Sequence, residues 1–346
     1  MTKGASKYLA GSRPLGKRRN WAYILKRATL GFIHSGSSDL AAGLTFYSIL
    51  SIFPALLALL SLLGLFGQSE ETSRIILTII KDHTPAEVSV LLEEPIRQLT
   101  TSPSAGLAFI TGIAGALWSA SSYIGALGRA LNQVYQVPEG RSFLALRLYN
   151  LVLTTLFLFL ITGILLLLFA SQTVLEKISL YLPHLLSDSG GQLWLSLRLP
   201  LIFLLSVGLL NLLYYWAPNI KQQSYRLLTP GAALALVLIA LASWGFNLYV
   251  DRFSNYNATY GVIAGLIILL LIVWICNNAL LLGAYLDLEI QRNHNLRAGI
   301  AAEDGPLLPP RHQSKAIKIQ ASQQELIEEG RQLRLAHQEE SEGSQP

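Results

Sequence analysis

Polar side chains within long apolar runs are the residues of this sequence best placed to do chemistry. Asn277 and Asn278 lie together in the last apolar run, and Asp39 stands at the start of the first, beside Ser37 and Ser38. An amide or carboxylate surrounded by hydrocarbon needs a partner, because an unsatisfied polar group there is costly. The two asparagines therefore indicate either hydrogen bonds between helices or the lining of a polar path. Asp39 suits a functional carboxylate or, in its Ser-Ser-Asp run, the cap of a helix.

A second set of candidates shares one face of a predicted helix, within the run WSASSYIGALGRALNQVY at residues 118–135. Small residues and an asparagine recur there at i, i+4, i+7 and i+11, which places them on adjoining positions of that face. These positions are Ser121, Gly125, Gly128 and Asn132. The resulting groove can bind a polar group or permit a tight contact between helices, and the sequence leaves both open. Arg129 is expected to reach lipid headgroups, and Tyr135 ends the run.

The segment DRFSNYNATYG at residues 251–261 is rich in amide and hydroxyl groups. Asn255, Asn257 and Thr259 can satisfy the exposed backbone groups of two helix ends, which is a sufficient structural role. The same side chains can also line the mouth of a polar path. Further along, Asp287 and Glu289 follow the last apolar run, where we expect water to solvate both carboxylates.

Local motifs for hydrolysis, metal binding or nucleotide binding are absent from the sequence. The six histidines form no HExxH or paired-ligand pattern, and neither GxSxG nor GxxxxGK[ST] occurs. Cys276 is the single cysteine, so neither an intramolecular disulfide nor a CxxC metal site can form. We therefore expect no catalytic activity, no metal and no cofactor. A third alternative is an intramembrane enzyme whose catalytic residues are distant in sequence and come together only in the folded chain.

The composition is that of a protein whose main solvent is lipid. The chain is 52% hydrophobic and 14% charged, with a mean hydropathy of +0.44, whereas soluble domains carry about a quarter charged residues. Its net charge of +5 does not indicate nucleic acid, because eight basic residues precede the first apolar run, where they orient a membrane protein. Membrane lipids are the expected partners, and nucleic acid is not.

Six segments are long enough to cross a bilayer, which takes about 20 mainly apolar residues. The predicted spans are residues 40–66, 107–127, 148–170, 199–217, 228–250 and 262–286. The sequence thus predicts an all-α integral membrane protein, a bundle of about six transmembrane helices. The second span is diluted by glycine and serine, which is typical of a helix buried among others.

The distribution of lysine and arginine predicts the orientation of these spans. Basic residues dominate residues 1–38, acidic residues dominate 67–105, and the excess alternates in the later loops. Both ends of the chain are therefore expected in the bacterial cytoplasm, with the six-span domain at residues 39–290 in the inner membrane.

Two segments outside the spans have patterns of their own. Residues 67–105 carry apolar residues at helical spacing, and we expect two short amphipathic helices that cap the bundle or serve as a gate or partner site. Residues 291–346 are polar and are expected to be a largely disordered tail with at most one short helix. Association into homo-oligomers is left open.

Three stretches of the chain together resemble a known family. They are AAGLTFYSILSIFPALLALLSLLGLFG, LWSASSYIGALGRALNQVYQV, and SNYNATYGVIAGLIILLLIVW leading into LLGAYLDLEI, all between residues 41 and 290. Their order and spacing are similar to those of the YihY/BrkB family of bacterial inner-membrane proteins. That resemblance implies six spans with both termini inside, in agreement with the charge distribution.

The resemblance also implies which positions recur in the family. They are Ala42, Tyr47, Pro54, Trp118, Arg129, Asn132, Tyr135, Tyr256, Asn257, Ala258, Thr259, Tyr260 and Gly261. This chain departs from the family after the last span, where Tyr285 stands in place of the usual acid. A role for that acid in proton or cation coupling is in doubt here unless Asp287 substitutes for it.

Similar proteins have been labelled as ribonucleases that process tRNA and as virulence factors. We do not transfer the ribonuclease label, because the sequence shows no catalytic cluster and no soluble RNA-binding domain. The residues favour a transporter or flippase-like protein, with a polar path between spans 107–127 and 262–286 and the 251–261 loop near its outer end. The solute or lipid is not specified by the residues. The alternative is a non-transporting scaffold or envelope-integrity protein that holds partners through its outer loop and tail.

Overall fold

The computed structural model of the chain describes residues 20–66, 105–169, 188–221, 228–253, 257–305 and 308–343. Every regular element within these ranges is an α-helix, apart from one isolated bridge between Ile220 and Pro310. The predicted all-α fold class is therefore confirmed for this part of the chain. The two amphipathic helices expected within residues 67–105 lie outside the described residues.

Each predicted span coincides with a long helix. These helices are α2 (Ser37–Phe66), α5 (Ala105–Val134), α6 (Phe143–Phe169), α8 (Asp188–Trp216), α9 (Pro230–Phe253) and α10 (Asn257–Arg297). Three described stretches are long and apolar enough to cross a membrane, and one apolar helix is shorter. The three are Phe143–Ile164, Ser196–Trp216 and Leu266–Arg297, and the shorter one is Pro230–Phe246. The described residues thus support a membrane protein with three candidate spans, and the count of six stays a prediction.

A shorter helix, α1 (Trp21–His34), precedes the bundle and ends in a tight turn. The side chain of Asn20 caps α1 by accepting a hydrogen bond from the backbone N–H of Tyr23 at 3.2 Å. Gly36 then adopts φ +66°, a left-handed conformation that glycine takes without steric cost, and α2 begins at the next residue. Asp39 consequently lies in the first turn of α2, where its exposed carboxylate meets the positive end of the helix dipole.

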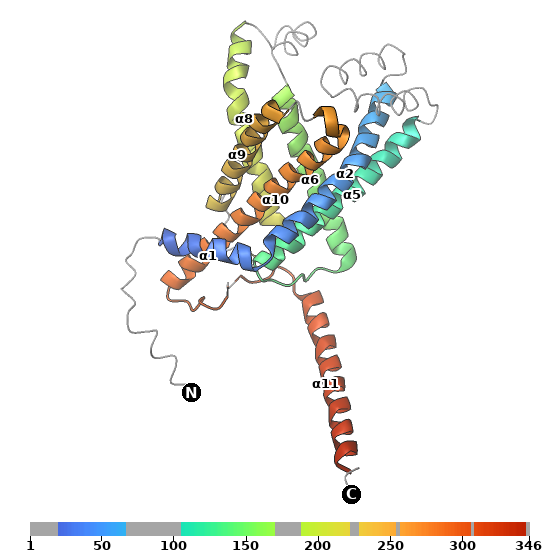
Figure 1. The fold of residues 1–346 in the computed structure, drawn as a ribbon, viewed down its shortest axis with the longest axis vertical. Helices are drawn as coiled ribbons and strands as arrows, with labels where there is room; N and C mark the ends of the chain where they lie inside the picture. Colours follow the sequence, from blue (N-terminus) through green and yellow to red (C-terminus); the bar gives the residue numbers. More distant parts are fainter. Residues whose placement is uncertain are drawn as a thin grey trace.

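The helices pack mainly in pairs (Figure 1). Helix α2 runs beside α5, α9 runs beside α10, and α6 lies against both α5 and α8. Helix α1 packs against α10 at one end of the bundle, which we call the α1 end. Fully buried apolar side chains from three of these helices form the centre of the core. They include Ala41, Leu44, Leu127, Leu131 and Leu281.

The pairing of α9 with α10 depends on two glycines. A Cβ atom added to Gly231 would collide with the carbonyl oxygen of Gly283, so only glycine allows the two backbones this close. Beside this crossing, the Asp287 carboxylate accepts hydrogen bonds from the Thr229 hydroxyl and, at 2.7 Å, from the Gly231 N–H. Asp287 therefore ties α10 to the first turn of α9, where the helix dipole favours a negative charge.

Helix α10 continues well past the predicted end of its span. Its 41 residues extend about 60 Å, twice the thickness of the bilayer's hydrocarbon core. In this extension Glu289 is only 3% exposed and lies 3.4 Å from Arg27 of α1 and 3.3 Å from Arg292. The expectation that water solvates Glu289 is wrong, because helix α1 lies across α10 and supplies Arg27 as an ionic partner.

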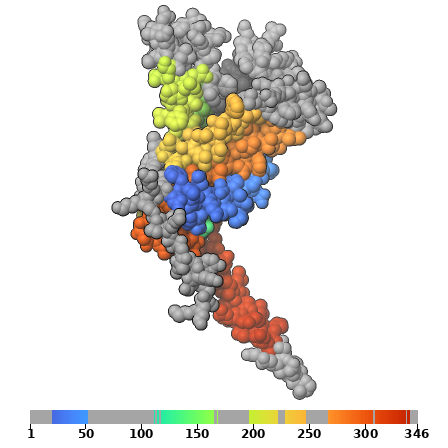
Figure 2. Space-filling view, turned by 60° about the vertical axis from the view of Figure 1, so that its left-hand side comes forward, coloured from blue at the N-terminus to red at the C-terminus, as the bar shows by residue number. Residues whose placement is uncertain are grey.

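The polar tail contains the long helix α11 (Ser314–Gly343). Figures 1 and 2 show it extending away from the bundle, and residues 317–335 are all exposed. The helix covers 30 residues, whereas the sequence favoured at most one short helix in a largely disordered tail.

Candidate functional site

The small-residue face of α5 packs against neighbouring helices. A Cβ atom on Gly125 would lie 2.8 Å from Nδ2 of Asn150 on α6, and one on Gly128 would lie 3.0 Å from the carbonyl oxygen of Ala217. Ser121, on the same face, is fully buried and donates its hydroxyl to the Trp118 carbonyl oxygen at 2.7 Å. Of the two readings left open by the sequence, the geometry of these positions fits the tight helix contact.

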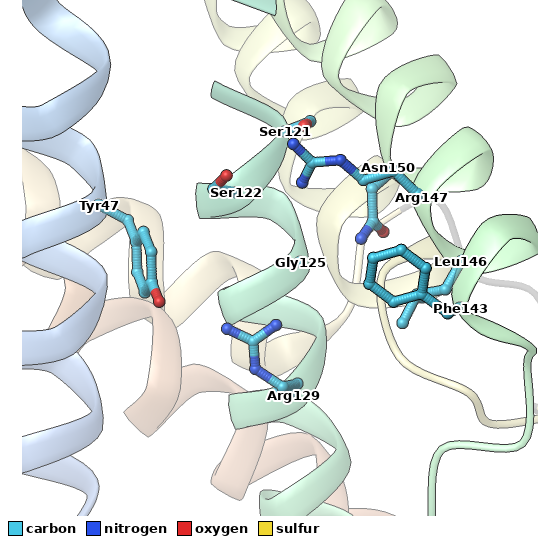
Figure 3. A pocket seen from close by; sticks show the side chains of 9 residues that line it. All are labelled: Tyr47, Ser121, Ser122, Gly125, Arg129, Phe143, Leu146, Arg147 and Asn150. Atoms are coloured by element: carbon cyan, nitrogen blue, oxygen red, sulfur yellow. The ribbon is translucent and has the colours of Figure 1, made fainter. Parts of the chain in front are cut away.

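A pocket of about 190 Å³ lies next to this contact, between α2, α5 and α6 (Figure 3). Side chains from all three helices line it, together with one glycine. They are Tyr47, Ser121, Ser122, Gly125, Arg129, Phe143, Leu146, Arg147 and Asn150. The predicted residues Ser121 and Arg129 thus come together here with residues of α6 that the sequence did not single out.

Two arginines give this pocket its charge. Arg147 stacks on Trp118, with its guanidinium carbon 3.7 Å from the ring centre, and its Nη2 donates to the Trp118 carbonyl oxygen at 3.2 Å. The Nε of Arg147 is buried and has no hydrogen-bond partner within the described residues. Arg129 is exposed and forms no ion pair there. Since none of the lining residues is acidic, the pocket carries net positive charge.

Asn150 is the polar side chain of the pocket that sequence reasoning missed. It is 6% exposed, and in Figure 3 its amide points towards α5. Within the described residues this amide makes no hydrogen bond. The signal was present, because Asn150 begins the apolar run of α6 in the same way that Asn277 interrupts that of α10. Nothing in the sequence indicated that α6 would bring it to α5.

Asn277 joins three helices. Its Nδ2 donates to the Thr45 hydroxyl of α2 at 3.2 Å, and its Oδ1 accepts from the Tyr123 hydroxyl of α5 at 3.0 Å. The side chain is only 2% exposed. Asn278 instead donates to the carbonyl oxygen of Trp274 in its own helix, at 2.7 Å. Both amides are therefore satisfied by protein groups, and neither lines the pocket.

Asn132 belongs to a hydrogen-bonded cluster at the α1 end. Its Oδ1 accepts from the backbone N–H of Asn219 at 2.7 Å, and its Nδ2 donates to Glu139 at 3.1 Å. Arg141 holds the same carboxylate with two hydrogen bonds of 2.8 Å. Burial raises the pKa of Glu139, but the hydrogen bonds and charge of Arg141, with the bond from Asn132, outweigh it and hold the pKa below its ordinary value of 4.5.

Asn219 connects this cluster to the C-terminal tail. Its side chain donates to the carbonyl oxygens of Pro138 and His312, at 2.9 and 2.8 Å, and accepts from the His312 N–H at 3.0 Å. Arg311 adds a hydrogen bond to the Tyr215 carbonyl oxygen at 2.7 Å. Five residues thus hold the root of α11 on the bundle, and we call them the tail joint. They are Asn132, Glu139, Arg141, Asn219 and His312.

Arg129 lies between the pocket and the tail joint. It also lines an open concavity of about 410 Å³, to which Asn132 and Glu139 of the joint contribute. Further along α5, Tyr135 is 3% exposed and belongs to the apolar core. Among the described residues, Tyr135 is not one of those that line the pocket.

The remaining candidates lie at or before the first turn of α10, apart from Tyr285, which lies nearer its C-terminal end. Asn257 and Thr259 form part of the first turn of α10, where the structure describes only the backbone, and Asn255 lies outside the described residues. Tyr285 donates its hydroxyl to Ser35 and packs edge-on against Phe32. The described part of the chain holds no group of three His, Cys, Asp or Glu side chains suited to a metal ion.

Comparisons with known proteins place this architecture in a family. Residues 29–307 match the family described as Virulence factor BrkB. The chain is 32% identical to a ribonuclease-like protein, YfkH, of Bacillus subtilis, over 76% of this chain and 93% of that one. It is 30% identical to a UPF0761 membrane protein of Tolumonas auensis, over 82% and 90% of the two chains.

A UPF0761 membrane protein of Kangiella koreensis is 25% identical, over 80% of this chain and 66% of that protein. No solved structure matches the chain. The family match covers most of the sequence and agrees with the apolar helices, so this chain is a membrane protein of the BrkB family.

Proposed function

We propose that this BrkB-family protein is a transporter or a flippase-like protein that moves a polar solute or a lipid headgroup through the membrane. One observation carries the proposal, the pocket in which Arg129, Arg147 and Asn150 meet between α2, α5 and α6. Ionisable side chains on membrane helices are costly and usually mark the pathway of a substrate. The pocket adjoins α5, as the predicted path does, but it lies towards α6 rather than α10.

We further propose that the α1 end faces the cytoplasm of a bacterial inner membrane. The support is the excess of basic residues before α1 and between residues 128 and 147, where three arginines accompany one acid, which follows the rule for cytoplasmic segments. In sealed vesicles of inverted inner membrane, added protease should remove α11, whereas right-side-out vesicles should protect it. Protection in the inverted vesicles would reverse the orientation.

Transport is tested with the purified full-length chain in liposomes. Two readouts are needed, because an electroneutral substrate or a lipid would generate no current. We expect charge movement with a panel of organic and inorganic anions, or accelerated exchange of a fluorescent phospholipid between leaflets, above the rate in protein-free liposomes. If both readouts equal the protein-free control, the transporter proposal fails.

The scaffold function is the second candidate, and α11 is the observation that favours it. A long exposed helix fixed at its root on the bundle offers a surface to partners. Deleting residues 314–346 should then change which proteins co-purify from crosslinked membranes, while the chain stays in the membrane. An unchanged set of proteins would contradict the scaffold function. Neither candidate involves catalysis, and we propose that the purified chain leaves RNA, lipid and peptide substrates intact.

A further inference from the structure

The pocket between α2, α5 and α6 offers hydrogen-bond donors and positive charge, and it has no acidic side chain of its own. We propose that it is a binding site for a phosphate-type oxyanion, carried either by a lipid headgroup or by free phosphate. The proposal of a binding site depends only on the contacts of the pocket residues. A role for this site in admitting a transported substrate rests in addition on the proposed transport function.

The two guanidinium groups supply the charge for such a ligand. A guanidinium presents its N–H groups in a planar fork that matches the oxygens of phosphate, and hydrogen bonds between such ions are about twice as strong as neutral ones. Arg147 uses Nη2 for the Trp118 carbonyl oxygen, while its buried Nε has no partner within the described residues. Arg147 lines the pocket and is half-buried, so its charge acts on a ligand held there.

Asn150 points to a ligand independently of the arginines. The residue is 6% exposed, and its side chain makes no hydrogen bond within the described residues. It lines the pocket, and Figure 3 shows its amide directed to the space beside Gly125. A buried amide usually has a partner in the protein or in what the protein binds. Its two N–H groups are donors, as an oxyanion requires.

The size of the pocket limits the ligand to a small group. Its volume of about 190 Å³ is below the range of about 300–1,000 Å³ that is typical of sites for drug-sized molecules. It therefore accommodates a phosphate group but not an entire nucleotide or lipid.

The surroundings of the pocket place it where phosphates occur in a membrane. Four of its lining residues, from Phe143 to Asn150, belong to the first two turns of α6, and Phe143 is 79% exposed. The ends of membrane helices lie near the depth of lipid headgroups. A lipid phosphate and a free phosphate from the adjoining water can both reach this depth.

Binding is tested on the purified full-length chain in an uncharged detergent free of phosphate. Calorimetric titrations use inorganic phosphate in one arm and phosphatidylglycerol, added as mixed micelles, in the other. We expect saturable binding in at least one arm. Binding of inorganic phosphate assigns the site to a free anion, and binding of phosphatidylglycerol alone assigns it to a headgroup.

The Arg129→Gln variant tests whether binding depends on the exposed arginine of the pocket. Arg129 is exposed and unpaired within the described residues, so its loss removes no folding contact. The affinity should fall at least tenfold, which corresponds to about 1.4 kcal/mol. Arg331→Gln is the matched control, because Arg331 lies on α11 and pairs only with Glu328 in that helix. Its affinity should equal that of the wild type.

Three results would overturn the site: no binding in either arm, equal affinity in Arg129→Gln and the wild type, or an equal loss in the control. These results are distinct from failure of the proposed function. Phosphate binding that depends on Arg129, without transport in liposomes, would leave the site in place and refute the transporter. Transport without such binding would refute the site alone.

Discussion

Replacing Asn219 by alanine should release the tail from the bundle. The fully buried side chain makes three hydrogen bonds, one to Pro138 and two to His312. Each contributes about 0.5–1.5 kcal/mol net, so their sum is about 1.5–4.5 kcal/mol. Pro138 and His312 are exposed residues whose backbone groups water can solvate once the amide is gone. The lower half of that range therefore applies, and we expect the tail joint to lose about 2 kcal/mol.

Native-state hydrogen exchange measures this loss directly. A change of about 2 kcal/mol makes local opening roughly 30-fold more frequent, so the backbone amides of Arg311 and His312, which bond to Asn219, should exchange faster by that factor. Asn278→Ala is the control, because its amide donates only within α10, and exchange in the tail should not change. Equal protection of the Arg311 and His312 amides in Asn219→Ala and the wild type would refute the assignment of Asn219 as the centre of the joint.

Three further predictions concern stability. The pKa of Glu139 is lowered in the folded chain, so its ionised carboxylate contributes fully to the free energy of unfolding above the ordinary pKa of 4.5. That contribution disappears as the pH falls through the folded pKa. Thermal melts should therefore show a loss of stability in acid for the wild type and no such loss for Glu139→Gln. Gly231→Ala should destabilise the chain by about 1–3 kcal/mol, because the added methyl group collides with the backbone of α10. At Gly208 an added Cβ has no neighbouring atom within 4 Å, so Gly208→Ala should be neutral or slightly stabilising in the same thermal melts. Asn277→Ala should lower the free energy of unfolding by about 1–2 kcal/mol in detergent, and an unchanged melting temperature would contradict its bonding role.

The positions of the long helices followed from the sequence because lipid imposes a simple requirement. A bilayer requires about 20 apolar residues in succession, and each predicted span lies largely within a helix of the structure. The end of α10 was less predictable, since the helix continues from residue 286 to Arg297. This extension carries a charge pair between Glu289 and Arg27, two residues far apart in sequence. Composition could not reveal that pairing.

The candidate site was predictable in part. Arg129 and Ser121 were identified from the pattern of α5, and both line the pocket. Asn150 and Arg147 were missed because the pocket exists only where α6 packs on α5, and the hydrophobic pattern of α6 does not specify that neighbour. Asn132 was identified as polar, but its partner Asn219 lies in a loop whose sequence carries no recognisable motif.

The tail shows the limit of compositional reasoning most clearly. Its polar residues indicated a solvated segment, and the exposure of α11 agrees with that. Its attachment depends on backbone atoms of Pro309, Arg311 and His312, which bond to Asn219 and Lys221 whatever their own side chains are. Backbone pairing of this kind leaves no signature in the sequence.

The helix α11 is also a rod with a fixed root. Its 30 residues give it a length of about 45 Å, so a rotation of about ten degrees at the root moves its far end by about 8 Å. The amplification works in reverse as well, since a modest force on the far end produces a large torque at the tail joint. Asn132 and Glu139 of that joint share a concavity with Arg129. A force on the tail therefore acts on Asn132, which lies one helical turn from Arg129 of the charged pocket.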